Sequence, residues 1–399
     1  MSDKKNKILI ICDYYLPGYQ SGGGLRTIVN TVERLKNRFD FFIITRDNDG
    51  DGIIYTTVKI DEWNNTENAQ VYYLSQKNLK ISKLRELIYE VKPHSIYINS
   101  VFSRLSIYVL ILNKLKALTH FNIILAPEGE LSPGALQVKS PKKKSFLNFS
   151  KTVGLFKNII WKTTSELEKR EVEKIKGSGG EIFIAPNMPP RHFYEEYRQE
   201  QKPAKFPGEA KMAFLSRYMK KKNFKWLLEH LSGIRGNLVI DIYGPLEDEA
   251  YWRESLAIIK TYPDNIKVEY KGVVYNEEVV STLFNYHFFL LPTLGENFGH
   301  VFLEAAAAGC PLIISDRTPW LNLEEKQIGW DLPLEKPEEW NKIINYCIAL
   351  DGLSYAKMSG NARRFSDRWL ADSKVIEDNA EVLEFSLNKP QAKAQNSSK

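Results

Sequence analysis

Uninterrupted apolar runs alternate with segments of helical periodicity along most of the chain. The first run, residues 8–12, has the pattern of a parallel strand that is buried on both faces. A loop with several glycines follows at residues 16–24, and residues 25–35 then repeat their apolar side chains at helical spacing. A strand, a glycine loop and a helix in this order predict the first unit of a Rossmann-like sheet.

The alternation occurs twice along the chain. Its first series has further runs at residues 41–45, 95–99, 122–126 and 181–185, and its second series has runs at 212–216, 238–243, 266–270, 288–292 and 311–315. A polar stretch with several prolines separates the two series, which is typical of a linker. A chain of 399 residues is also long enough for two hydrophobic cores. The pattern therefore predicts an α/β protein with two doubly wound parallel sheets.

The domain boundaries follow from where this alternation stops and restarts. We predict a first domain at residues 1–190, a linker at 191–207 and a second domain at 208–354. Two helical segments follow at about 355–369 and 373–387. Residues 388–399 have no apolar periodicity and are predicted to form a disordered tail.

The composition excludes several classes of protein. Apolar residues make up 43% and charged residues 26%, as in ordinary globular proteins. The three cysteines are scattered singly, which suits neither a disulfide framework nor a zinc site and favours a reducing compartment. The first apolar run is too short for a signal peptide, and no run reaches the ~20 apolar residues of a membrane-spanning helix. We expect a cytoplasmic protein, attached at most to a membrane surface.

A basic segment at residues 139–162 contains no acidic side chain, and aromatic residues are interleaved with its lysines. The lysines are Lys139, Lys142, Lys143, Lys144, Lys151, Lys157 and Lys162. This pattern is typical of a segment on an anionic membrane surface, but also of a solvated face whose apolar positions point inward. No nucleic-acid recognition motif accompanies the lysines, so nucleic acid is not an expected partner.

The stretch that bears most directly on chemistry is residues 293–311. Glu296 lies just before an alanine-rich helix and Glu304 lies eight positions later. If the intervening chain is helical, at ~1.5 Å per residue the two are about 12 Å apart, comparable to the reach from a hexose through a diphosphate to a ribose. The carboxylates would accept hydrogen bonds from the hydroxyls of both sugars, and backbone N–H groups at residues 298–301 would bind the diphosphate. The alternative is a pair of surface glutamates on an amphipathic helix.

Two cations follow the strand predicted at residues 212–216. Arg217 and Lys222 at a strand's carboxyl end suit a diphosphate leaving group, whose charge grows as the glycosidic bond breaks. Lys220 and Lys221 lie there too, so a merely basic loop is the alternative. Gly244 and Val273 follow the next two strands of the same sheet, a position that favours contact with a nucleotide.

Taken together, these residues resemble the retaining glycosyltransferases of family 4, whose fold is the two-Rossmann GT-B architecture. Residues 296–304 match that family's Glu-x7-Glu motif, and Arg217 with Lys222 matches its Arg-x4-Lys pair. The likeness covers nearly the whole chain. It implies that residues 355–387 pack back onto the first domain.

The resemblance also implies a role for each residue of the site. Glu296 would contact the transferred sugar, Glu304 the ribose, and Arg217 with Lys222 the diphosphate. The remaining donor-binding residues that it implies are Gly22, Gly23, Gly24, Asn297, Phe298, Gly299, His300 and Val301.

The likeness to bacterial enzymes of capsule, lipopolysaccharide or exopolysaccharide assembly implies the substrates. The donor would be a UDP-sugar, favoured over a GDP-sugar, that carries a hexose or an N-acetylhexosamine. The acceptor would be a glycan or a saccharide linked to polyprenyl diphosphate, the latter placing the enzyme at the inner face of the cell membrane. Lys142, Lys143 and Lys144 are assigned to that acceptor or membrane contact.

One position departs from the family pattern. Many members carry a histidine after the fourth strand of the first domain, whereas here Glu128 occupies about that place, with Glu130 close by. Either carboxylate can accept a proton from the acceptor hydroxyl, hydrogen-bond a sugar or cap a loop. These three alternatives stay open at this point.

The acidic loop Asp47-Asn-Asp-Gly-Asp-Gly52 has only a superficial likeness to a metal site. As an EF-hand it fails, because its twelfth position is Val58 instead of a bidentate glutamate. It also matches the Asp-x-Asp signature of single-Rossmann-domain glycosyltransferases, but it lies in the domain that is not expected to hold the donor. We predict neither a metal nor another cofactor.

Two other functions stay open. One is a non-hydrolysing nucleotide-sugar epimerase on the same fold, and the other is a non-catalytic protein that binds a saccharide or a nucleic acid.

Overall fold

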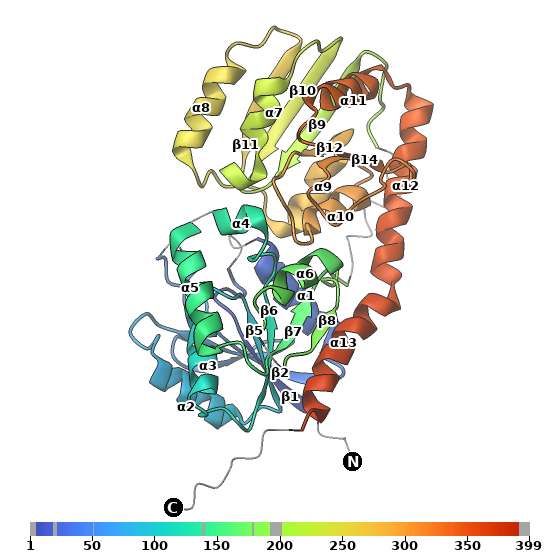
Figure 1. Ribbon diagram of the computed structural model, residues 1–399. Coiled ribbons are helices and arrows are strands. Elements are labelled where there is room, and N and C mark those ends of the chain that lie inside the picture. Colours follow the sequence, from blue (N-terminus) through green and yellow to red (C-terminus); the bar gives the residue numbers. More distant parts are fainter. Residues whose placement is uncertain are drawn as a thin grey trace, which may run out of the picture. The chain divides into compact units, whose positions relative to one another are not determined.

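The computed structural model describes residues 5–18, 22–50, 52–137, 140–177, 179–191 and 202–390. Two compact units make up the chain, the first formed by residues 1–190 with 373–399 and the second by residues 191–372. Each unit is an α/β structure built on a largely parallel sheet (Figure 1). The two doubly wound sheets predicted from the apolar runs are therefore confirmed.

The first unit contains an eight-stranded sheet with the order β3-β4-β2-β1-β5-β6-β7-β8, in which only the β3–β4 pair is antiparallel. Its strands are β1 (Asn6–Ile11), β2 (Phe39–Arg46), β3 (Trp63–Asn65), β4 (Gln70–Leu74), β5 (Ser95–Asn99), β6 (Asn122–Ala126), β7 (Ile160–Thr163) and β8 (Ile182–Ile184). Its helices are α1 (Gly23–Leu35), α2 (Ile81–Val91), α3 (Arg104–Lys114), α4 (Pro133–Gln137), α5 (Ser140–Val153), α6 (Glu166–Glu173) and α13 (Ser373–Asn388).

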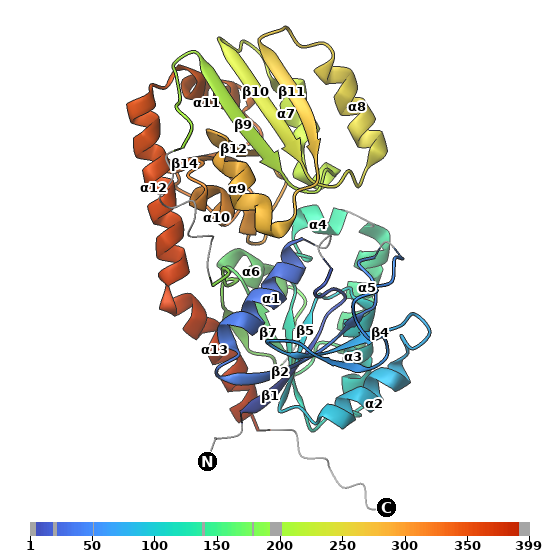
Figure 2. The ribbon, with the colours of Figure 1, turned by 180° about the vertical axis from the view of Figure 1, so that it is seen from behind.

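Helices cover both faces of this sheet, which explains why β1 is apolar without interruption. Leu9 and Ile11 point to the face that carries α2, α3 and α5, while α1 and α13 lie side by side over the other face (Figure 2). The order of the strands reverses between β1 and β5, so the loops that leave these two strands diverge at one edge of the sheet.

The second unit contains a six-stranded sheet that is parallel throughout, with the order β11-β10-β9-β12-β13-β14. Its strands are β9 (Glu209–Leu215), β10 (Asn237–Tyr243), β11 (Ile266–Gly272), β12 (Phe288–Leu291), β13 (Leu312–Ser315) and β14 (Gly329–Leu332). Its helices are η2 (Lys220–Lys222), α7 (Phe224–His230), α8 (Glu249–Ile259), η3 (Asn276–Glu278), α9 (Val279–Phe284), α10 (His300–Ala307), α11 (Pro337–Ala349) and α12 (Gly352–Ala371), of which η2 and η3 are 3-10 helices. This 3-2-1-4-5-6 order is that of the Rossmann fold, and it reverses between β9 and β12.

The C-terminal helices differ from the expectation that residues 355–387 pack together on the first domain. The helix α12 belongs to the second unit, which extends to Asp372, and only α13 belongs to the first. Trp369 of α12 packs against Phe298 and Trp320, with ring centroids 5.7 and 5.3 Å apart. Residues 192–201 of the predicted linker and 391–399 of the predicted tail lie outside the described residues.

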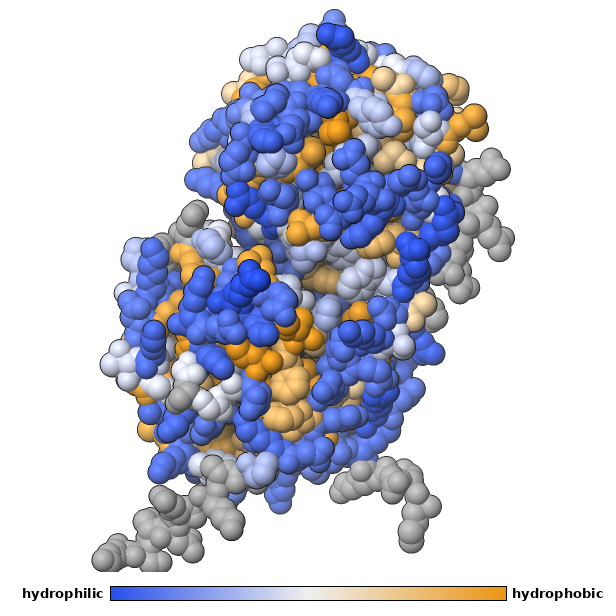
Figure 3. Space-filling view, turned by 45° about the vertical axis from the view of Figure 1, so that its right-hand side comes forward, coloured by the Kyte–Doolittle hydropathy of each residue, from blue (hydrophilic) through white to orange (hydrophobic). Residues whose placement is uncertain are grey.

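The basic segment is mostly an integral part of the first unit. Leu147, Phe156 and Trp161 are buried in its core, so these apolar positions point inward, as in the second of the two alternatives for the segment. Among the described residues of the segment, Phe149 is exposed, as are Lys142, Lys144, Lys151 and Lys157; Lys139 lies outside the described residues. Hydrophilic side chains cover most of the face in Figure 3. Within the described ranges, no helix is long and apolar enough to cross a bilayer.

Candidate active site

The loops after β9 and β12 meet where the second sheet reverses its order. The N–H of Leu294 donates to the carbonyl of Lys221 at 2.9 Å, and the hydroxyl of Thr293 donates to the same oxygen at 3.3 Å. Neighbouring strands whose connections leave in opposite directions open a crevice at their carboxyl ends, where doubly wound proteins bind ligands. The predicted donor residues of both loops therefore share one edge of the second unit.

Lys222 and Glu296 are in direct contact at this edge. The short helix η2 directs the ammonium of Lys222 to Oε1 of Glu296, and the Thr293 hydroxyl lies 3.3 Å from the same oxygen. Each side chain of the pair is only 12% exposed. Burial alone would raise the pKa of Glu296, but Lys222 and Lys221 hold it below its ordinary value. Glu296 is thus a carboxylate at neutral pH, able to accept hydrogen bonds from sugar hydroxyls.

Arg217 lies in the same loop but pairs with a different carboxylate. Its Nη1 donates to Oε1 of Glu247 at 3.1 Å, and the two side chains are 41% and 36% exposed. An exposed pair of this kind contributes only ~0–1 kcal/mol. Arg217 can therefore exchange Glu247 for a phosphate at little cost.

The helix that carries Glu304 begins later than predicted. The α10 helix starts at His300, with Gly299 as its N-cap in the left-handed region (φ 79°), and Phe302 N–H already donates to the Gly299 carbonyl at 2.9 Å. Because residues 296–299 are not helical, the premise of the 12 Å estimate between Glu296 and Glu304 is wrong. Glu304 itself is buried in α10.

The side chain of Phe298 is buried in the core of the second unit. Its ring packs against Trp320, whose indole N–H donates to the Phe298 carbonyl. The helix N-terminus available to a diphosphate therefore begins at His300 and Val301, two residues beyond the predicted start. Asn297 lies in the non-helical stretch before it.

Gly244 holds the ends of neighbouring strands together. Its φ is 121°, its N–H donates to the Gly272 carbonyl at 2.9 Å, and a Cβ at this position would lie 2.1 Å from the carbonyl oxygen of Ser216. Its glycine identity is thus explained by a close approach of backbones. Val273 is exposed beside it, and its contact with a nucleotide stays a prediction.

The glycines of the first unit form the start of α1. Gly22 is the N-cap (φ 62°), Gly23 is the first helical residue, and the Gly24 carbonyl accepts a hydrogen bond from Asn99 Nδ2 at 3.3 Å. Asn99 ends β5, the strand beside β1 at which the first sheet reverses its order. The predicted glycine loop therefore lies at the edge of the first sheet where a ligand is expected.

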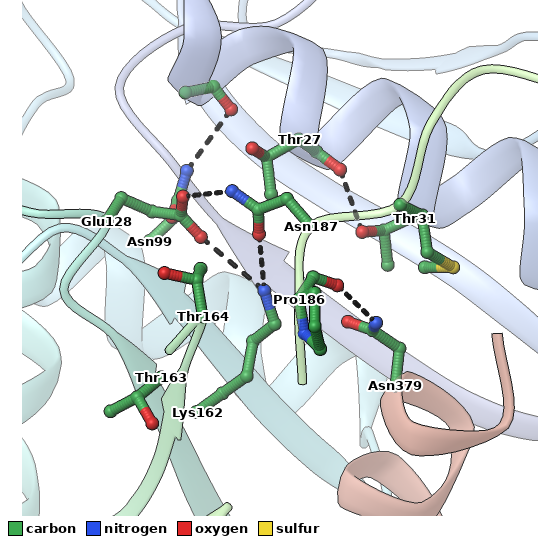
Figure 4. A network of polar contacts seen from close by, with 12 residues as sticks. Thr27, Thr31, Asn99, Glu128, Lys162, Thr163, Thr164, Pro186, Asn187 and Asn379 are labelled. Carbon is green, nitrogen blue, oxygen red and sulfur yellow. Dashed lines mark hydrogen bonds and ion pairs between the residues drawn. The ribbon is translucent and has the colours of Figure 1, made fainter. Parts of the chain in front are cut away.

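Glu128 lies near the same edge, directly after β6, within a network of buried polar side chains (Figure 4). Its Oε2 accepts a hydrogen bond from Asn187 Nδ2 at 2.7 Å, and Lys162 Nζ lies 3.6 Å from its Oε1. The sequence analysis did not single out Lys162 or Asn187 as members of this site. The available signal was a lysine within the apolar run that forms β7, a position where a charge needs a partner.

The carboxylate of Glu130 is hydrogen-bonded to the loop that precedes α3. It accepts hydrogen bonds from Val101 N at 2.6 Å, from Ser100 Oγ at 2.8 Å and from Phe102 N at 3.3 Å. Burial raises its pKa, and these hydrogen bonds oppose the rise. Of the three alternatives for Glu130, the structure shows the loop cap.

The remaining predicted residues lie apart from these two sheet edges. Lys143 donates to the Ala135 carbonyl at 2.8 Å, which ties α5 to α4, while Lys142 and Lys144 point to solvent. In the acidic loop, Asn48 Nδ2 donates to buried Asp47 at 2.6 Å, and Asp51 is outside the described residues. Among the residues with described positions, no group of three or more His, Cys, Asp or Glu side chains could hold a metal ion.

Comparison with known structures identifies the fold as GT-B. The chain is similar to sucrose-phosphate synthase from Thermosynechococcus elongatus, with a TM-score of 0.70 at 16% identity over 95% of this chain and 98% of that one. It is also similar to HepE from Anabaena in complex with UDP-glucose, with a TM-score of 0.67 at 14% identity over 95% and 99% of the two chains. A third neighbour is WaaG, a glycosyltransferase involved in lipopolysaccharide biosynthesis, with a TM-score of 0.61 at 11% identity over 96% and 100%.

Residues 195–365 match the family of glycosyl transferases group 1. The match includes Arg217, Lys222, Glu296 and Glu304. No curated protein sequence matches the chain significantly. The family match and the GT-B fold together support a glycosyltransferase.

Proposed function

We propose that this protein is a metal-independent retaining glycosyltransferase that moves a hexose or an N-acetylhexosamine from a nucleotide-diphosphate sugar to a lipid-linked saccharide. The observation that carries the proposal is the Lys222–Glu296 pair at the point where the second sheet reverses its order. The match of residues 195–365 to glycosyl transferases group 1 supports the same assignment. A UDP-sugar is the favoured donor, because two structures to which this chain is similar contain one: HepE with UDP-glucose, and the trehalose-6-phosphate protein from E. coli with UDP-2-fluoro glucose.

In this proposal the second unit binds the donor. Glu304 accepts hydrogen bonds from the ribose hydroxyls, and Glu296 accepts them from the transferred sugar. Arg217 and Lys222 hold the diphosphate, whose negative charge increases as its bond to the anomeric carbon breaks, so both cations stabilise the transition state more than the ground state. Lys222 already faces a carboxylate in this structure, so it can balance Glu296 and the phosphates together.

The first unit is assigned to the acceptor. The acceptor oxygen forms its bond to the anomeric carbon on the face from which the diphosphate departs, so the configuration is retained. Its proton passes to Glu128, and the diphosphate leaves with the electron pair of the broken bond. Lys142, Lys144, Lys151, Lys157 and Phe149 are each exposed, and a lysine contributes ~1 kcal/mol to binding when it lies near an anionic leaflet. These side chains support a lipid-linked acceptor and a location at the inner face of the membrane.

A donor panel tests the proposal. The protein is incubated with UDP-glucose, UDP-N-acetylglucosamine, UDP-galactose or GDP-mannose in excess EDTA, with and without a bacterial lipid-linked oligosaccharide fraction as acceptor. We expect nucleotide release that depends on the acceptor, accompanied by label in the lipid fraction. Release or sugar isomerisation without any acceptor would favour the epimerase instead. Activity that returns only with Mn²⁺ or Mg²⁺ would contradict the metal-independent mechanism.

A further inference from the structure

Lys162 is a buried cation in the middle of the first unit. Its side chain is 2% exposed, and it lies in β7 beside the buried residues Trp161 and Thr163. An ammonium at such a position is strongly unfavourable unless it is paired and hydrogen-bonded. Lys162 Nζ donates to Asn187 Oδ1 at 2.6 Å and lies 3.6 Å from Glu128 Oε1 (Figure 4).

Asn187 links the ammonium to the carboxylate. Its Oδ1 accepts from Lys162, and its Nδ2 donates to Glu128 Oε2 at 2.7 Å. The reversed amide would place its NH2 group against the ammonium and its oxygen against the carboxylate, so only the observed orientation satisfies both neighbours. Both oxygens of Glu128 therefore face positive or hydrogen-donating groups, an arrangement that requires Glu128 to act as an acceptor.

The position of Asn187 is itself held from two sides. The carbonyl of Pro186 accepts from Asn379 Nδ2 of α13 at 2.7 Å (Figure 4), and the carbonyl of Met188 accepts from Asn30 Nδ2 of α1 at 2.8 Å. Asn187 is buried between these two residues. Its amide is thus fixed by the helices that cover this face of the sheet.

The backbone of Glu128 is fixed as well. Glu128 has a left-handed conformation (φ 51°), which is uncommon outside glycine. The next residue, Gly129, donates its N–H to Glu168 Oε1 at 2.6 Å, and Glu168 also accepts from Thr164 N at 2.7 Å. The loop and the carboxylate of Glu128 are therefore both positioned by contacts within the protein, as preorganised catalysis requires.

We propose that Lys162, acting through Asn187, is a positioning residue that orients Glu128 and keeps it ionised to receive the acceptor proton. This inference rests on the proposed transfer reaction, in which Glu128 is the base. Lys162 does not touch the substrate in this scheme, and its effect is transmitted through the amide and the charge.

Three groups from three elements bear on the charge of Glu128. Lys162 of β7 stabilises the carboxylate, whereas Glu168 of α6 opposes it as a like charge, and burial together with Glu128 raises the pKa of Glu168 to about 7. Tyr97 of β5 is neutral, because burial and the two glutamates raise its pKa well above the ordinary value. Removing the Lys162 ammonium therefore leaves Glu128 in a largely buried site without its cationic neighbour, which favours its protonated form.

Carbon-13 NMR of the full protein labelled at the glutamate carboxyl carbon tests this directly. The Glu128 signal is assigned by its loss in Glu128→Gln and is followed with pH in the parent and in Lys162→Met. We expect the change from carboxylate to carboxylic acid to occur at least one pH unit higher in Lys162→Met. Lys114→Met, which removes an exposed lysine of α3 in the same unit, is the matched control and should leave the signal unchanged.

A second variant tests the same inference independently, in case Lys162→Met fails to fold. Asn187→Ala keeps the ammonium but removes the linking amide, and it should move the Glu128 signal in the same direction by a smaller amount, because one hydrogen bond to the carboxylate is lost. Thermal unfolding of each variant confirms that the signals come from folded protein. A Glu128 signal that titrates at the same pH in the parent and in a folded Lys162→Met or Asn187→Ala variant would overturn the inference.

Turnover separates this inference from the proposed function. If Glu128 is the base, Glu128→Gln should lower turnover by roughly 10²–10⁴-fold. In Lys162→Met the acid limb of the turnover profile should move to higher pH, with the donor KM little changed. A parent without transferase activity would refute the proposed function. Full activity in Glu128→Gln would overturn the inference together with the role of Glu128 as the base, and would leave the transferase assignment intact.

Discussion

Replacing Lys222 by Met removes the ammonium that faces Glu296 while keeping a side chain of similar length. Glu296 then remains as a largely buried carboxylate with only the Thr293 hydroxyl and Lys221 nearby to stabilise it. Removal of one partner from a buried ion pair costs roughly 3–5 kcal/mol, and the 12% exposure of both side chains favours the lower end. About 3 kcal/mol corresponds to a fall of roughly 6–12 °C in the unfolding temperature of a domain of this size.

Differential scanning calorimetry of Lys222→Met measures this fall, and two further variants calibrate it. Arg217→Met breaks the exposed pair with Glu247 and should cost less than ~1 kcal/mol. The double variant Lys222→Met with Glu296→Gln should recover part of the loss, because no unpaired charge stays buried. If Lys222→Met lowers the transition no more than Arg217→Met does, the pair is not the buried charge centre that we infer.

Three other predictions concern the second unit. Gly244→Ala should lower the free energy of unfolding by ~2–5 kcal/mol, since its Cβ would lie 2.1 Å from the Ser216 carbonyl oxygen. Gly272→Ala is the control, because a Cβ there would have no atom within 4 Å, and it should cost only ~1–2 kcal/mol. Equal losses in thermal unfolding would contradict this geometry. Burial and nearby lysines lower the pKa of His287 to about 4. The neutral ring therefore contributes to the free energy of unfolding in full above pH 6.5, and this contribution is lost as the pH falls through 4. The loss is about 3 kcal/mol, and an equally steep acid dependence in His287→Gln would refute this assignment. Glu304→Gln should weaken UDP binding at least tenfold in calorimetry, since hydrogen bonds to a charged group are worth ~1.5–3 kcal/mol, and unchanged affinity would exclude Glu304 from the ribose site.

The sheets could be predicted because parallel strands covered on both faces are apolar without interruption. Residues 8–11 and 288–291, for example, are all fully buried in the structure. The meeting of Lys222 with Glu296 could be anticipated for a related reason, since both follow strands of one parallel sheet and therefore emerge at one edge. Their pairing depends on β9 and β12 being neighbours, which the order of strands along the chain does not reveal.

Other features depend on tertiary contacts that no local pattern encodes. The apolar periodicity of α12 and α13 is similar, and tertiary contacts such as the packing of Trp369 on Phe298 and the hydrogen bond from Ser366 Oγ to the Leu303 carbonyl assign the first of them to the second unit. The apolar residues of the basic segment suit either a membrane surface or a protein core, and the structure shows that Trp161 is buried in the core. The partners of Lys162 lie after β6 and after β8, so its role could be recognised only once the register of the three strands β6, β7 and β8 was known.

Hydrogen–deuterium exchange with and without saturating UDP tests the central claim most directly, namely that the reversal point of the second sheet binds the nucleotide diphosphate. We predict slower exchange in residues 216–223 and 293–304, which contain Lys222, Glu296 and Glu304. The ribose and diphosphate contacts should restrict the opening of these loops and of the first turns of α10. Protection confined to the first unit, or no protection at saturating UDP, would contradict the assignment of the donor site.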